Sequence, residues 1–479
     1  MVLRLLEILA PPLARRLIHN SIRITLMKLT FYGGVKSVTG ANYLIEEGPS
    51  TRSGRPTRAL VDCGLQQGSN FSEKQNWNPF LYNPAEIDAV FITHAHIDHI
   101  GRLPSLVKAG FKGKIYSTPP TKDAAELLLL DSDHILAQTA ERLKMPLLFS
   151  SEDIPKVMEL WEGVEYYHPV KIGELEINFY NAGHILGSSF LLIQGPSQSS
   201  GRRVRIIFSG DLGNSPAPLL GDKDTLPETD YCLIESTYGN RVHENLSQRK
   251  EALEDVVEDT VKQGGVLLIP AFAMERTQEL IYELNELAER GRIPRAPIFI
   301  DSPLAIKLID VYKKYQKYLT VPVDFNIPGI KMTLTTEESK SINDVRPPKI
   351  IIAGSGMSHG GRILHHERRY LPDPKSTIVI IGYQATGSLG RQILDGAKTV
   401  RIFGEDVPVR CQVRNIPAYS AHADQPQLLK WLQSQRQNLK KVFVAQGEEI
   451  ESNALSQKIR DEMAVQTEVP QEVGASYEL

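Results

Sequence analysis

Three histidines and one aspartate stand within six residues of this chain, and no other feature limits the fold as strongly. They are His94, His96, Asp98 and His99, directly after the apolar run at residues 89–92, which is typical of a short buried strand. Burying these polar groups without partners would cost roughly 1–3 kcal/mol each, which excludes a place in a hydrophobic core. Imidazole and carboxylate groups are common metal ligands. We therefore predict a metal-binding loop at a strand end, in preference to a solvated polar loop.

Other β-branched runs along the chain also stop at a polar residue or a glycine. They lie at residues 59–61 before Asp62, 204–208 before Asp211, 233–234 before Glu235 and 378–381 before Gly382. Longer helical patterns occupy residues 123–143 and 276–290. Strands and helices mixed in this way predict an α/β protein with layered sheets. Because ligands in such proteins gather where strands end, the polar residues at these ends are candidates for one composite site.

Length and composition narrow the function classes. A chain of 479 residues is too long for one ordinary core and predicts two or three domains. No apolar run approaches the roughly 18–20 residues that span a bilayer, so we expect no membrane partner. The three cysteines lie far apart and predict neither a disulfide framework nor a cysteine zinc site, which fits a cytoplasmic setting. The net charge of −3 does not itself favour a nucleic-acid binder, although a basic groove can exist locally.

Residues 1–26 differ from the rest of the chain. Four arginines against one glutamate give this segment a formal charge of +3. Pro11 and Pro12 interrupt the apolar stretch that a secretory signal would need. An Arg-rich transit peptide is one interpretation. We favour the other, an N-terminal extension that is disordered or precedes the true start, with Met27 opening the folded domain.

The segment HAHIDH resembles the HxHxDH signature of the metallo-β-lactamase superfamily, and the other core motifs follow in order. Asp62 in ALVDCG, His184 in NAGHILGS and Asp211 in IFSGDLG match them. The resemblance implies two zinc ions. It assigns His94, His96 and His184 to the first ion, Asp98 and His99 to the second, and Asp211 to both. Two such ions can activate water and clamp a phosphate between them.

Later segments resemble the β-CASP nucleases of this superfamily. DYCLIESTYGNR is similar to their first added motif, with Glu235 as its acid, and PAYSAHADQ places His422 at the second. The resemblance implies that His422 protonates the leaving oxygen with Glu235 beside it, and that Asp98 completes the catalytic set. It covers about residues 27–449. The similarity is greatest to bacterial and archaeal relatives of the eukaryotic pre-mRNA 3′-end cleavage endonuclease.

Substrate contacts are also implied by the resemblance. AFAMERTQE is similar to a segment in which an arginine, here Arg276, is a candidate phosphate contact, although Glu275 replaces the usual glycine. IFIDSPLA and IIAGSGMSHGG add Ser302, Ser355 and Gly356. A Gly-Ser-Gly turn exposes backbone N–H groups that can cradle a phosphate.

One position departs from the family pattern. The third β-CASP motif normally has a histidine that completes the second metal site, and KKVFVAQGEE places Gln446 there. A glutamine carbonyl can ligate a metal but is a weaker ligand than imidazole. Two interpretations stay open: the second ion binds loosely, or a water takes the place of the missing histidine. Three further histidines are assigned less specific roles. We interpret His134 as structural, and His365 and His366 as surface residues or neighbours of the ligands.

We therefore expect an αββα metallo-β-lactamase sandwich from residues 27–235 and 419–479, with an α/β β-CASP cap at residues 236–418. Single-stranded RNA would thread the cleft between them. The expected activity is zinc-dependent hydrolysis of RNA phosphodiester bonds, mainly endonucleolytic, with 5′–3′ exonucleolytic action left open. The alternatives are a non-catalytic RNA-binding scaffold and a metallohydrolase of small substrates. A homodimer is also left open.

Overall fold

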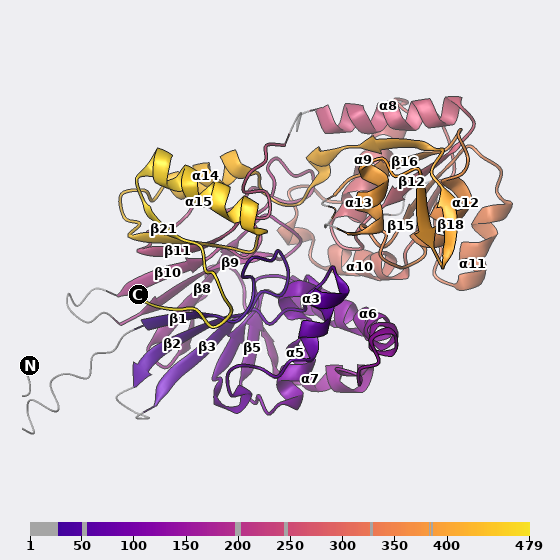
Figure 1. Cartoon of the computed structure of the whole chain (residues 1–479). Helices are drawn as coiled ribbons and strands as arrows, with labels where there is room; N and C mark the ends of the chain where they lie inside the picture. Colours follow the sequence, from indigo (N-terminus) through magenta and orange to yellow (C-terminus); the bar gives the residue numbers. More distant parts are fainter. Residues whose placement is uncertain are drawn as a thin grey trace, which may run out of the picture.

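The computed structural model describes residues 27–49, 55–196, 203–243, 248–325, 329–382, 384 and 387–479. The expected extension at residues 1–26 lies outside these ranges. Within them, two seven-stranded sheets and one six-stranded sheet form the framework (Figure 1).

The first two sheets pack face to face. In spatial order the first contains β22 (Ser476–Glu478), β1 (Met27–Phe31), β2 (Tyr43–Pro49), β3 (Pro56–Val61), β4 (Ala89–Phe91), β5 (Lys114–Ser117) and β6 (Trp161–Gly163). The second contains β21 (Gln466–Glu468), β20 (Lys441–Ala445), β11 (Tyr231–Glu235), β10 (Val204–Phe208), β9 (Ser189–Gly195), β8 (Leu175–Asn181) and β7 (Val170–Ile172). Alternate side chains of both sheets, including Phe31, Phe91, Phe179, Phe208 and Phe443, form one buried core.

Helices cover the outer faces of this sandwich. The first sheet is flanked by α4 (Ile97–Ile100), α5 (Leu103–Lys108), α6 (Pro119–Leu143) and α7 (Ile154–Leu160), and the second by α14 (Gln425–Gln433) and α15 (Glu449–Met463) (Figure 1). The αββα arrangement expected from the sequence is therefore confirmed. Helix α6 begins four residues earlier than its apolar pattern, because Thr118 caps its N-terminus and two prolines occupy the first turn.

The third sheet belongs to the cap and all its strands are parallel. Its order is β14 (Ile330–Met332), β13 (Ile298–Asp301), β15 (Lys349–Ala353), β12 (Val266–Pro270), β16 (Thr377–Ile380) and β19 (Gln412–Asn415). One face packs on α8 (Arg249–Lys262), α9 (Arg276–Glu289) and α10 (Pro303–Lys314). The other packs on α12 (Ile363–Tyr370), α13 (Leu389–Leu394) and the hairpin of β17 (Thr399–Ile402) and β18 (Glu405–Pro408), with α11 (Thr336–Ser341) close by.

The cap is an insertion between two neighbouring strands of one sandwich sheet. The chain leaves the sandwich after β11 and returns in β20, and these two strands pair in parallel, with Glu235 opposite Ala445. The residue limits 236 and 418 stay a prediction. Among the described residues, no helix has both the length and the apolar character needed to cross a membrane.

Candidate metal and catalytic centre

The HAHIDH segment forms a tight loop at the carboxyl end of β4. The carboxylate of Asp62 holds this loop, since it accepts hydrogen bonds from the backbone N–H of Thr93 and from Nδ1 of His99, each at 2.8 Å. Gly64 is needed beside it, because a Cβ there would overlap the carbonyl oxygen of Asp98. Residues outside the motif therefore fix the positions of the ligands within it.

Four of the predicted ligands converge next to this loop. Nδ1 of His96 lies 3.1 Å from Nε2 of His94 and 3.2 Å from Nε2 of His184. Oδ2 of Asp211 lies 3.4 Å from Nε2 of His94 and 3.5 Å from Nε2 of His184. With zinc–nitrogen bonds of 2.0–2.1 Å, tetrahedral ligand atoms stand about 3.4 Å apart. The spacing of these four donors therefore fits a tetrahedral zinc ion.

The protonation states in this cluster also suit a cation. Burial and the adjacent His94 hold the pKa of His96 well below its ordinary value. Burial and the neighbouring imidazoles do the same to the pKa of His184. Burial alone would raise the pKa of Asp211, but His99 and His94 beside it hold that pKa well below its usual range. Neutral imidazoles and an ionised carboxylate are the forms that bind metal.

A histidine–glutamate pair adjoins the cluster. Nδ1 of His422 lies 3.2 Å from Oε2 of Glu235 and 3.9 Å from Oδ2 of Asp211. Glu235 is buried at the end of β11, and its Oε1 also accepts a hydrogen bond from the N–H of Leu212 at 2.6 Å. Burial alone would lower the pKa of His422, but the charge and hydrogen bond of Glu235 raise it to about 9. The imidazolium is thus held through Nδ1, while Nε2 carries the second proton.

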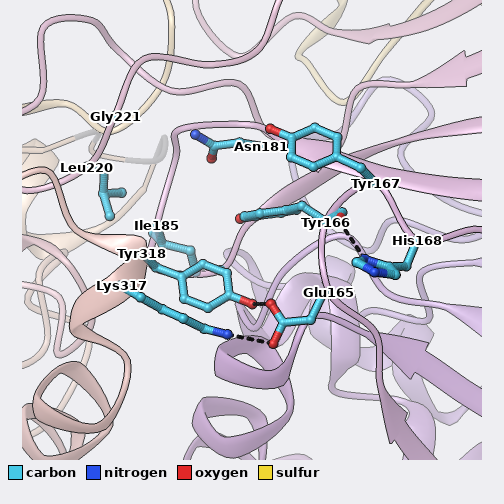
Figure 2. Close-up of a pocket in the computed structure, with 11 residues that line it drawn as sticks. Glu165, Tyr166, Tyr167, His168, Asn181, Ile185, Leu220, Gly221, Lys317 and Tyr318 are labelled. Atoms are coloured by element: carbon cyan, nitrogen blue, oxygen red, sulfur yellow. Dashed lines mark hydrogen bonds and ion pairs between the residues drawn. The ribbon is translucent and has the colours of Figure 1, made fainter.

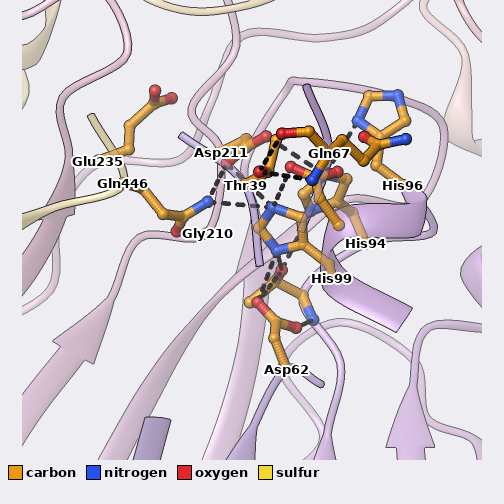
Figure 3. A network of polar contacts seen from close by, with 12 residues as sticks. Thr39, Asp62, Gln67, His94, His96, His99, Gly210, Asp211, Glu235 and Gln446 are labelled. Atoms are coloured by element: carbon orange, nitrogen blue, oxygen red, sulfur yellow. Dashed lines mark hydrogen bonds and ion pairs between the residues drawn. The ribbon is translucent and has the colours of Figure 1, made fainter. Parts of the chain in front are cut away.

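The predicted second metal site differs from the first. Nε2 of His99 lies 3.7 Å from Oδ2 of Asp98 and 3.4 Å from Oδ1 of Asp211. The side-chain N–H₂ of Gln446 donates to Oδ1 of Asp211 at 3.0 Å and lies 3.1 Å from Nε2 of His99 (Figure 3). The hydroxyl of Tyr43 donates to Oε1 of Gln446 at 3.4 Å. A hydrogen-bond donor therefore stands where the resemblance expects a ligand.

Comparisons with known proteins agree with this geometry. Three family models match successive parts of the chain: a metallo-beta-lactamase superfamily domain at residues 55–206, a Beta-Casp domain at residues 277–393, and a Zn-dependent metallo-hydrolase RNA specificity domain at residues 406–470. Ribonuclease TTHA0252 of Thermus thermophilus is 37% identical over 432 residues, which cover 88% of this chain and 94% of that protein. This chain belongs to the β-CASP nuclease family. The resemblance read from the motifs is confirmed.

Two further matches extend the comparison of this β-CASP protein. Transcription termination factor FttA of Methanosarcina mazei is 29% identical over 468 residues, which cover 92% of this chain and 70% of that protein. The crystal structure of a protein of unknown function from Enterococcus faecalis has a TM-score of 0.54 and 13% identity, covering 95% of this chain and 100% of the other. At that identity the likeness extends to the fold alone.

The predicted substrate contacts of this β-CASP chain lie in the cap, outside the metal cluster. Arg276 is buried, pairs with Glu279 and donates to the carbonyl of Tyr419 at 2.8 Å. A direct phosphate contact would require Arg276 to leave the Glu279 pair, and its role stays a prediction.

The other predicted contacts lie at the carboxyl ends of two inner strands of the cap sheet. Ser302 caps the N-terminus of α10, and the hydroxyl of Ser355 accepts a hydrogen bond from the N–H of His359 at 3.1 Å. A Cβ at Gly356 would press on the ring of Phe272, so the loop requires glycine there. These residues shape the loops after β13 and β15, and their contacts with substrate stay a prediction.

Some residues that build the centre were not singled out from the sequence. The hydroxyl of Thr93 donates to Oδ2 of Asp62 at 2.8 Å and lies 3.1 Å from Nδ1 of His94. His243 is buried, and its Nε2 lies 2.9 Å from the carbonyl oxygen of His422. Thr93 directly precedes the motif and could have been suspected. Nothing in the sequence pointed to a role for His243, because its hydrogen-bond partner His422 is 179 residues away.

The cap and the sandwich also share a pocket of about 500 Å³ beside the loop that carries His184. Tyr166 and Tyr167 line it from the sandwich, and Lys317 and Tyr318 line it from the cap (Figure 2). Glu165 accepts hydrogen bonds from both cap residues, at 2.8 Å from Lys317 and 2.6 Å from Tyr318. These contacts bridge the two domains next to His184, a predicted metal ligand.

Proposed function

We propose that this β-CASP protein is a zinc-dependent ribonuclease that hydrolyses phosphodiester bonds in single-stranded RNA, mainly endonucleolytically. One observation carries the proposal: Asp211, within 3.5 Å of two histidines predicted to bind metal, also lies 3.9 Å from the Glu235-paired His422. A cation site and a proton donor therefore meet at a single carboxylate. The relative named a ribonuclease and the matched RNA specificity domain support RNA as the substrate.

Residues of this chain divide the work of hydrolysis. Bound zinc would supply two effects: it activates a water molecule, and it offsets the negative charge that develops on the phosphate. His94, His96, His184 and Asp211 would hold the first ion. Glu235 fixes the ring of His422 through Nδ1, so that Nε2 can pass its proton to the leaving oxygen of the ribose. The buried position of Glu235 keeps the donor oriented between turnovers.

Asp98, His99 and Asp211 would hold a second zinc ion. We propose that it binds more weakly than the first, because the Gln446 amide occupies the fourth side of this subsite.

The non-catalytic scaffold is the less favoured alternative, since all six predicted ligands remain and lie together. Three buried free thiols, Cys63, Cys232 and Cys411, support our expectation of a reducing cytoplasmic setting.

The test uses the full chain with zinc and a uridine-rich RNA labelled either at its 5′ end or internally. We expect internal cleavage by the wild type, a loss of at least 100-fold in Asp98→Ala, and no change in Asp395→Ala, an exposed aspartate of the cap. Release of mononucleotides from the 5′ end would instead show exonucleolytic action. RNA that stays intact with zinc-loaded wild type would refute the proposal.

A further inference from the structure

A second pocket, of about 490 Å³, lies on the outer side of the cap. Helices α11 and α12 and the short turn after α11 form its walls. Figure 1 shows α11, α12 and β18 at the end of the cap that points away from the two sandwich sheets. The pocket is therefore separate from the metal centre. We call it the outer pocket.

Positive charge is concentrated in this pocket. Lys340, Arg362, Arg368 and Arg369 line it, and none of its lining residues is acidic. This is unusual in a chain whose net charge is −3. A pocket lined by basic side chains creates a local positive potential that attracts anions, even when the protein as a whole is nearly neutral.

The floor of the outer pocket is rigidly built. The buried carboxylate of Asp301 accepts hydrogen bonds from Arg362, Ser339 and Nε2 of His366, each at 2.7 Å. These bonds hold the pKa of Asp301 far below its usual range, despite the burial that would raise it. These hydrogen bonds thus compensate the negative charge of Asp301 beneath the pocket, and they hold Arg362 and His366 in place.

Cations above this floor remain available to a ligand. Within the described ranges, no ion pair engages Arg369, whose guanidinium lies over the ring of Tyr370, and none engages Lys340. Arg368 pairs only with the exposed Glu405, at 2.8 Å. Residues 362, 365, 366 and 369 are spaced by three or four and share one face of α12. That face extends roughly 10 Å along the helix axis, at 1.5 Å per residue.

An exposed aromatic pair borders these cations. Phe403, at the turn between β17 and β18, is 52% exposed. Its ring lies 4.7 Å from the ring of His365, with an angle of 35° between the planes. His365 also lines the outer pocket. A stacking surface beside unpaired cations is the combination with which proteins bind single-stranded nucleic acid without reading sequence.

We propose that the outer pocket binds a second stretch of the single-stranded RNA whose cleavage is proposed above. Phosphates contact Lys340 and Arg369, and a base stacks on Phe403. Arg362 directly follows the loop of Ser355 and Gly356, so one loop of the chain connects the outer pocket to these predicted substrate contacts. Long RNA engages both places, and short RNA engages only the cleft. Affinity therefore rises with RNA length.

The experiment measures binding of fluorescent oligouridines of about 4 to 24 nucleotides to the full zinc-loaded chain, in an Asp98→Ala background that preserves the RNA. For long RNA we expect Phe403→Ala to weaken binding roughly 5- to 100-fold. We expect Arg369→Ala to lower the slope of log Kd against log salt by about 0.7. The shortest RNA should bind all variants equally. Both side chains are exposed, and unchanged thermal unfolding of the variants would show intact folding.

Two control variants match these changes elsewhere on the surface. Arg295→Ala removes an exposed arginine before β13, at the opposite end of the cap strands, and Phe71→Ala removes an exposed aromatic ring from the sandwich. Neither should change the length dependence. Equal effects of Arg295→Ala and Arg369→Ala would overturn the inference.

Three further outcomes separate the remaining explanations. If the Asp98→Ala parent binds long RNA and the added Phe403→Ala or Arg369→Ala change leaves that binding unaltered, the outer pocket is not an RNA site and the proposed function stands. If neither this parent nor wild type binds RNA of any length, the proposed function falls together with the inference. If inorganic phosphate or polyglutamate binds in an Arg369-dependent way while RNA does not, the pocket serves a small anion or an acidic protein, which overturns the inference.

Discussion

Replacing Gln446 by histidine should convert the proposed weak second metal site into a tight one. In the wild type the Gln446 amide donates to the carboxylate of Asp211 at 3.0 Å and lies 3.1 Å from Nε2 of His99. A cation in this subsite needs the same two atoms, so the amide must release them first. Histidine at position 446 would remove this competition and add an imidazole ligand.

The size of the effect follows from the two contacts. A hydrogen bond to a charged group contributes about 1.5–3 kcal/mol and one to a neutral group about 0.5–1.5 kcal/mol. Losing both costs about 2–4.5 kcal/mol, which corresponds to roughly 30- to 2,000-fold weaker binding of the second ion. A ligand bond from Oε1 of Gln446 would offset part of this cost. We therefore expect a gain of at least tenfold in Gln446→His.

The assay is zinc content per chain after dialysis against a series of zinc buffers, read by elemental analysis and native mass spectrometry. Wild type should retain one ion at low free zinc and take up the second only at higher free zinc, whereas Gln446→His should retain two. Gln446→Ala, which frees Asp211 and His99 without adding a ligand, should fall between them. If wild type already holds two ions as tightly as Gln446→His does, the competition argument is wrong.

Three other changes test separate parts of the site. His422→Gln should lower kcat about 10²- to 10⁴-fold without changing zinc content, because it removes the proton donor but no ligand of the first ion; a parallel loss of zinc would contradict that role. Gly64→Ala should displace the loop around Asp98, so we expect lower zinc content and a lower melting temperature by calorimetry, whereas Gly360→Ala, with nothing within 4 Å of its Cβ position, should have little effect on zinc content. Burial and the neighbouring Glu279 raise the pKa of Glu275 to about 8, so the folded state holds a proton that the unfolded state loses above about 4.5. Between those pH values the unfolding free energy of wild type should fall by up to about 1.4 kcal/mol per pH unit, and Glu275→Gln should lack this component in denaturant titrations.

Much of the centre could be anticipated because its residues follow strands. His94, Asp211 and Glu235 come directly after or at the end of apolar runs, and parallel or neighbouring strands bring such ends together. What could not be anticipated depends on partners distant in the sequence. The i, i+3 spacing allows Arg276 to pair with Glu279, but the carbonyl of Tyr419, to which Arg276 also donates, is 143 residues away. The side-chain N–H₂ of Gln446 faces inward because Tyr43, 403 residues away, donates to its oxygen.

The outer pocket could not be predicted from the sequence either. The basic residues of α12 look like an ordinary solvated helix face, since arginines at such positions usually meet water. Phe403 is an isolated aromatic residue in a turn, and only the packing of the β17–β18 hairpin against α12 brings it onto His365. Helical periodicity shows which residues share a face, but not which neighbouring element completes it.

The insertion of the cap between β11 and β20 has a consequence for synthesis on the ribosome. When the cap has emerged, the sandwich still lacks β20, β21 and β22, and the first strand of the domain, β1, has no neighbour on its outer edge. His422 and Gln446 are also absent from the early sandwich, although the HAHIDH loop was made hundreds of residues before. In the proposed mechanism, a nascent chain therefore carries the predicted metal ligands before it has the residue that protonates the leaving oxygen. The proposed hydrolytic activity then arises only with the strands that close the sheet.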